Sequence, residues 1–80
     1  ENTEISNVVI YPNPFNNSLF LNATSKDESS YSVRDMAGKA IASGSFIESF
    51  ELNTTEWNSG FYLIQVTSNN QEVQYKALKL

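Results

Sequence analysis

The sequence predicts a small all-β domain, a single antiparallel β-sandwich of about seven strands that is Ig-like in its general layout. Short stretches of alternating apolar and polar residues are separated by turn residues about every 8–12 positions, as in sandwiches and small barrels. No segment has a sustained helical period. At 80 residues the chain makes one domain, and five Phe, four Tyr and one Trp supply much of its core.

The first two predicted strands flank a proline-rich break. Ile5–Tyr11 is apolar and β-branched, and Pro12-Asn13-Pro14 ends it, because two prolines remove two backbone donors and push their neighbours out of helical conformations. Ser18–Ala23 follows as the second strand, with leucines on one face and Phe20 on the other.

The third strand, Ser30–Asp35, ends in a strong turn signal. Asp35 can accept hydrogen bonds from backbone amides, and Gly38 can take a positive φ, as in a type I turn with a bulge. Lys39–Ala42 then returns as the fourth strand. A second tight turn is expected at Ser43-Gly44.

The fifth predicted strand, Phe46–Leu52, is followed by one capped turn of 3₁₀- or α-helix. Asn53 suits the N-cap position, and Glu56 stands three residues later, as in a capping box. Trp57 is then expected to plug one end of the core.

The last two strands form a hairpin. Phe61–Thr67 is the most apolar stretch, so we expect it to be a central strand, and Gly60 before it is expected to provide a positive φ. Asn69-Asn70 makes the turn, because Asn tolerates positive φ. The final strand runs from about Glu72 to Leu80.

The chain is acidic, with a net charge of −4 and a pI near 4.5. This balance argues against nucleic acid or an anionic membrane as the partner. The apolar runs are far too short to span a membrane, and residues 1–7 are polar and acidic, unlike a signal peptide. We interpret the chain as the end piece of a larger precursor whose export signal was removed or lies elsewhere.

Residues suited to catalysis or metal binding are scarce. His and Cys are absent, which excludes the usual general base, a thiol nucleophile and a disulfide scaffold. No Ser-x-x-Lys spacing occurs. Asp27-Glu28, the only adjacent acidic pair, is interpreted as a solvated loop, because a calcium site needs more oxygen ligands. We therefore expect no enzyme activity, no cofactor and no metal.

A set of ordered motifs covers the chain from about Val8 to Leu80. Its elements are Tyr11-Pro12-Asn13-Pro14-Phe15, Tyr31-x-Val33-x-Asp35-x-x-Gly38-Lys39, Gly60-Phe61-Tyr62-Leu63-Ile64-x-Val66 and a last strand with Lys76 and Lys79. Taken in this order, the set resembles the type A C-terminal sorting domain of the type IX (Por) secretion system.

The resemblance implies a non-catalytic Ig-like signal domain at the C-terminus of an exported precursor. A separate N-terminal signal takes such a precursor to the periplasm, where the translocon and an outer-membrane shuttle barrel recognise the C-terminal domain. A sortase-like cysteine protease then removes the domain, and the cargo reaches the cell surface or the medium. Residues 1–7 are expected to be the linker from the cargo domain.

Recognition candidates follow from the matched motifs. Each also has a structural explanation: the prolines end a strand, Asp35 and Gly38 form a turn, and Tyr62 belongs to the core. The candidates are Pro12, Asn13, Pro14, Asp35, Gly38, Gly60, Tyr62, Lys76, Lys79 and Leu80.

The last strand leaves two readings open. Lys76 and Lys79 follow the last acidic residue, Glu72, and give the tail a local charge of +2. Apolar residues occur on both of its faces, so the strand is either partly unpaired and offered to a partner by strand addition, or an ordinary edge strand with protective lysines. The first reading also allows a weak dimer through an edge strand.

The aromatic content supports a second function, a small carbohydrate-binding or adhesive accessory module. Such a module needs at least two exposed, coplanar aromatic rings. The strand alternation instead predicts that the aromatic side chains are buried.

Overall fold

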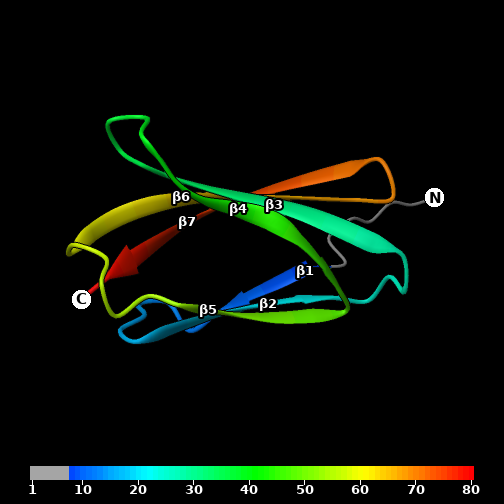
Figure 1. Cartoon of the computed structure of the whole chain (residues 1–80), viewed down its shortest axis with the longest axis horizontal. Helices are drawn as coiled ribbons and strands as arrows, with labels where there is room; N and C mark the ends of the chain where they lie inside the picture. Colours follow the sequence, from blue (N-terminus) through cyan, green and yellow to red (C-terminus); the bar gives the residue numbers. More distant parts are fainter. Residues whose placement is uncertain (1–7) are drawn as a thin grey trace.

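In the computed structural model, residues 8–80 form a β-sandwich of seven strands, as predicted (Figure 1). One sheet has the order β1-β2-β5 and the other β4-β3-β6-β7, and all strand pairs within them are antiparallel. Residues 1–7, with the predicted start of the first strand and the expected linker, lie outside the described residues. The strands are β1 (Val8–Tyr11), β2 (Ser18–Ala23), β3 (Glu28–Asp35), β4 (Ala40–Ile47), β5 (Ser49–Asn53), β6 (Gly60–Ser68) and β7 (Gln71–Lys79).

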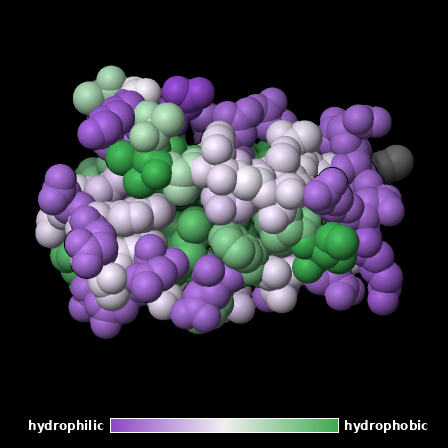
Figure 2. Space-filling view, in the orientation of Figure 1, coloured by the Kyte–Doolittle hydropathy of each residue, from purple (hydrophilic) through white to green (hydrophobic). Residues whose placement is uncertain are grey.

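The core lies between the two sheets. Alternate residues of each strand point inward, and the most completely buried aliphatic side chains are Leu19, Leu21, Val33, Ile64 and Val66. Burial of each such side chain stabilises the fold by about 1.5–3 kcal/mol. In Figure 2 apolar atoms form a band along the middle of the molecule, between the two layers of Figure 1. β6 lies between β3 and β7, so the predicted central strand is confirmed.

The predicted turn at Ser43-Gly44 is wrong, because β4 runs without a break from Ala40 to Ile47. Gly44 is needed for space: a Cβ atom there would lie 3.0 Å from the hydroxyl oxygen and 3.1 Å from a ring carbon of buried Tyr31. The chain changes sheet instead at Glu48, which has a φ of 68°. Glu48 is exposed, so this left-handed corner buries no charge.

The predicted capped turn after the fifth strand is confirmed as a single hydrogen-bonded turn, which does not continue into a helix. Asn53 accepts hydrogen bonds at Oδ1 from the backbone N–H (3.1 Å) and hydroxyl (2.8 Å) of Thr55, and the first is the bond expected of an N-cap residue. The N–H of Trp57 then closes a single turn to the carbonyl of Thr54 at 3.0 Å. The buried Thr54 hydroxyl donates to the carbonyl of Asn16 at 2.9 Å and ties this loop to the β1–β2 connection.

The two other turn predictions are confirmed. Oδ1 of Asp35 accepts from the backbone N–H of Ala37 (3.0 Å) and of Lys39 (2.8 Å), and Gly38 has a φ of 90°. Asn69 and Asn70 have φ angles of 52° and 65° in the β6–β7 hairpin. Local side-chain chemistry is sufficient to determine both turns.

Not every aromatic residue is buried, contrary to the expectation from alternation. Tyr11 is 42% exposed and Phe61 45% exposed, because each lies on the outer face of its sheet. In a two-layer sandwich only one face of each sheet is covered. No helix among residues 8–80 is long and apolar enough to cross a membrane.

Replacing Gly44 by valine is expected to destabilise the domain by about 1–3 kcal/mol, because the new side chain overpacks against the Tyr31 ring. For a domain of this size each kcal/mol lowers the melting temperature by about 4–8 °C, which circular dichroism measures. Ser43→Val is the matched control, since Ser43 lies on the exposed face of the same strand. Similar melting temperatures for the two variants would contradict the packing argument.

Candidate functional site

One end of the sandwich collects segments that are far apart in the sequence. Figure 1 shows the end of β7, the start of β6, the β3–β4 turn and the β1–β2 connection at this end. We call it the β7 end and define it by Pro12–Phe15, Asp35–Lys39, Asn58–Tyr62 and Lys76–Leu80. All of the sequence-predicted recognition candidates belong to these segments, so the fold brings the separate motifs together.

The Pro12–Phe15 segment leaves the three-stranded sheet and crosses to the outer edge of β7. The N–H of Phe15 donates to the carbonyl of Leu78 at 2.8 Å, and the N–H of Leu80 donates to the carbonyl of Phe15 at 2.9 Å. These bonds form a parallel bridge between Phe15 and Lys79. The Phe15 side chain is almost fully buried, so it anchors the crossing segment in the core.

The Asn13 side chain extends this pairing. Its Oδ1 accepts from the N–H of Leu78 at 3.1 Å, and its Nδ2 donates to the carbonyl of Lys76 at 3.4 Å. Pro12 and Pro14 have no N–H to donate, so the amide of Asn13 provides strand-like hydrogen bonds where its neighbours cannot. Asn13 and Phe15 together thus cover the edge from Lys76 to Leu80.

The reading of the last strand as partly unpaired is wrong, because β7 pairs with β6 along its whole length, from Gly60↔Lys79 to Ser68↔Gln71. The two lysines also differ. Lys79 is only 6% exposed, and its Nζ donates to the carbonyl of Leu80 at 3.2 Å. Lys76 is exposed on the outer face, with Nζ 4.7 Å from the ring centroid of Phe61.

Three aromatic residues close the core at the β7 end. Trp57 meets Phe15 edge to face at a centroid distance of 5.8 Å and lies 4.9 Å from Tyr62, so its predicted role as a plug is confirmed. The hydroxyl of Tyr62 donates to the carbonyl of Asn58 at 2.7 Å. Burial, and secondarily the negative charge of Asp35, raise the pKa of Tyr62 above its ordinary value of 10.0.

An open cleft of about 460 Å³ lies between the β3–β4 turn and the loop before β6. Of the predicted candidates, Asp35, Gly60 and Tyr62 line it. Sequence reasoning did not select Trp57 or Met36, which also line it. Aromatic residues in a small chain resemble core residues, so no local signal separates the two roles. The cleft offers contact surface, and the described residues contain no cluster of three metal-ligating side chains.

The remaining candidates have backbone roles at this end. Gly38 completes the turn beside the cleft, and Gly60 has a φ of 137° at the start of β6. Leu80 is exposed next to the crossing segment. Whether any of these residues contacts a partner stays a prediction.

The sequence model of one family, described as the secretion system C-terminal sorting domain, matches residues 9–79. This match spans nearly the whole chain. The chain belongs to that family. A search of curated proteins found no match. The resemblance predicted from the motifs is therefore confirmed, and this sorting domain is a type IX secretion signal that serves export across the outer membrane to the cell surface or extracellular space.

Replacing Asn13 by alanine is expected to cost about 1 kcal/mol and to speed hydrogen exchange of the Leu78 amide about fivefold, because that amide loses its acceptor. Exchange measured by NMR tests this. Asn16→Ala is the control, since the Asn16 side chain makes no hydrogen bond within residues 8–80. An unchanged Leu78 exchange rate in Asn13→Ala would show that the crossing segment holds β7 without this side chain.

The sorting domain is expected to lose stability as the pH rises through the folded-state pKa of Tyr62, which lies above 10.0. Unfolding lowers this pKa to its ordinary value, so the unfolded chain ionises first and the contribution is complete only below about pH 10. Urea unfolding at a series of alkaline pH values measures the effect. In Tyr62→Phe the alkaline loss should be smaller, and equal pH dependence in both proteins would contradict the assignment.

Proposed function

We propose that this sorting domain acts as a folded, non-catalytic recognition module, which the type IX translocon and an outer-membrane shuttle barrel bind at the β7 end. The observation that carries the proposal is the convergence of four separated motif segments, one of them Lys76–Leu80, at the β7 end. A motif set that converges on one surface is expected if that surface is recognised. It is not required by a linear tail signal.

The pairing of the last residues supports recognition of a fixed shape. Leu78 and Leu80 are bonded to the crossing segment on one side, and β6 pairs with β7 on the other. Preorganised backbone reduces the entropy that a partner must overcome on binding. In this proposal Lys76 and Leu80 contact the machinery, whereas Pro12, Asn13 and Pro14 position them.

The proposed route begins in the periplasm and ends with removal of the domain. A sortase-like protease cleaves before the first strand, within or ahead of the linker that we assign to residues 1–7. Cleavage there separates the cargo from the domain without cutting the β-sandwich, because paired strands are cut less readily than loops and chain ends.

A carbohydrate-binding or adhesive module remains the second candidate. Tyr11 and Phe20 lie together on the outer face of the three-stranded sheet, beside Asn22, whose amide donates to the Tyr11 hydroxyl at 3.3 Å. Their rings stack on each other at 5.4 Å with an interplanar angle of 20°. Rings that cover one another in this way do not form the side-by-side platform that a sugar requires, so this candidate stands second.

The sorting role is tested by fusing the chain to the C-terminus of a fluorescent cargo that carries its own periplasmic signal, in a bacterium with a type IX system. We expect cargo at the surface or in the medium, and its retention in the periplasm when Lys76–Leu80 are deleted, because the deletion removes the partners of Phe15. Gln71→Ala, at the opposite end of β7, is the control for export, because Gln71 is exposed. Retention of the intact fusion would favour the second candidate, which NMR titration with polysaccharides then tests at Tyr11.

A further inference from the structure

The outer face of the four-stranded sheet carries a basic and apolar patch beside the β7 end. Arg34 of β3, Leu63 of β6 and Lys76 of β7 form one row of cross-strand neighbours. Phe61 and Leu78 form the next row. These five residues, the outer patch, point away from the core because their neighbours Val33, Tyr62, Ile64 and Ala77 are buried.

The cations of the outer patch have no carboxylate partners among residues 8–80, where the one salt bridge joins Lys26 and Glu48. Arg34 donates only a long hydrogen bond of 3.4 Å to the carbonyl of Gly38. Lys76 is held over the Phe61 ring. The patch therefore presents two exposed positive charges with Leu63 between them.

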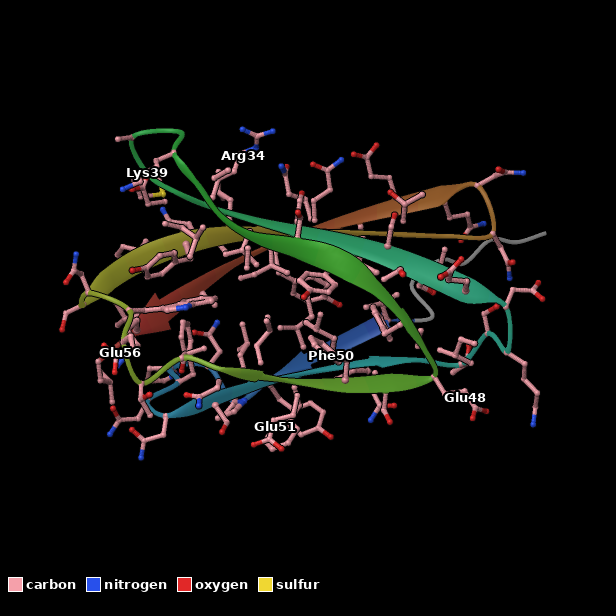
Figure 3. All side chains as sticks on the ribbon, in the orientation of Figure 1. Arg34, Lys39, Glu48, Phe50, Glu51 and Glu56 are labelled. Carbon is pink, nitrogen blue, oxygen red and sulfur yellow. The ribbon has the colours of Figure 1, made fainter. Side chains whose placement is uncertain are left out.

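Charge is unevenly placed on this acidic domain. Figure 3 shows Arg34 projecting from the outer side of the four-stranded sheet, whereas Glu51 projects from the opposite side, below the three-stranded sheet. The next cross-strand row on the patch side, Ser32–Gln65–Gln74, is uncharged and separates the patch from Glu28 and Glu72, which lie at the far end of the same outer face. An anionic partner is therefore attracted to the outer patch and not to the whole face.

We propose that the outer patch binds an acidic protein segment of the secretion machinery in which two carboxylates, about 10 Å apart, flank an apolar side chain. The spacing follows from three adjacent strands about 4.8 Å apart. The guanidinium of Arg34 can hold one carboxylate in a bidentate pair, and Lys76 attracts the second as a point charge. Leu63 and Phe61 supply the apolar contact between them. This inference rests on the proposed function and adds the chemistry of the partner.

Charge distinguishes a protein partner from an anionic membrane. The net charge of −4 includes the +2 of Arg34 and Lys76, and −4 minus +2 leaves −6 on the other residues. A broad anionic membrane would face that charge as well as the patch, and two cations are fewer than the four to eight of typical lipid-binding clusters. A narrow acidic segment can contact the patch alone.

The test uses the secretion fusion with single charge reversals. Arg34→Glu and Lys76→Glu should each lower export about tenfold, because like charges then face each other across the interface. Lys26→Glu is the matched control: Lys26 is exposed at the far end, and loss of its exposed ion pair has little effect on stability. Melting temperatures of the purified chains check that every variant folds. Sedimentation with phosphatidylcholine vesicles, with and without phosphatidylglycerol, tests the membrane.

Each outcome bears on the proposal. The proposal is supported if Lys26→Glu is exported at the wild-type level, both patch variants lose export, and the wild-type chain does not bind anionic vesicles. Normal export of the patch variants would overturn the inference and the contact proposed for Lys76, and would leave the sorting role intact. An equal loss for Lys26→Glu would show that net charge matters rather than the patch. Wild-type binding to anionic vesicles that Arg34→Glu abolishes would assign the patch to a membrane. Retention of the wild-type fusion in the periplasm would remove the proposed function and this inference together.

Discussion

The hydrogen bonds between Phe15 and β7 are the constraint on which this end of the sandwich depends. They join a segment that follows β1, in one sheet, to the edge strand of the other sheet. The buried Phe15 ring fixes the position of the segment, and Asn13 adds two side-chain bonds to the same edge. Without this crossing, β7 would end with exposed backbone groups on its outer side, and such edges readily pair with other chains.

The same crossing organises the aromatic closure and the cleft. Phe15 packs edge to face with Trp57, and Trp57 in turn packs against Tyr62. Tyr62 stands beside Asp35, at the start of the turn that forms the other wall of the cleft. Phe15 thus connects the end of β7 to the loop before β6, whereas the hydrogen bonds of Asp35 hold the β3–β4 turn on the other side of the cleft.

The distribution of charge follows from the layer structure. In a sandwich, the outer faces of the two sheets look in opposite directions, so outward residues of one sheet cannot neutralise those of the other. Arg34 and Lys76 lie together near the β7 end of the outer face of the four-stranded sheet, Glu28 and Glu72 lie at its far end, and Glu51 lies on the other side of the sandwich. An acidic chain can therefore present a small basic and apolar patch next to the motifs that mark it as a sorting domain.

The sequence by itself determined what depends on neighbouring residues. Alternation identified the strands, although it misplaced the boundary between β4 and β5, and the apolar character of Phe61–Thr67 placed β6 at the centre. Asp35, Gly38, Asn69 and Asn70 specified their turns because each acts within its own loop. The motif order was enough to predict the family.

The tertiary structure alone decided what depends on distant residues. A glycine in a turn and a glycine beneath an aromatic ring look the same in the sequence. Only the position of Tyr31 on the neighbouring strand shows that Gly44 is there to leave space for a ring. Alternation separates the faces of a strand, but it does not say which face the second sheet covers, so the exposure of Tyr11 and Phe61 was not predictable. The bonds from Asn13 to β7 join residues more than 60 positions apart and leave no local trace, and so the burial of Lys79 and the closure of the β7 end could be seen only in the folded chain.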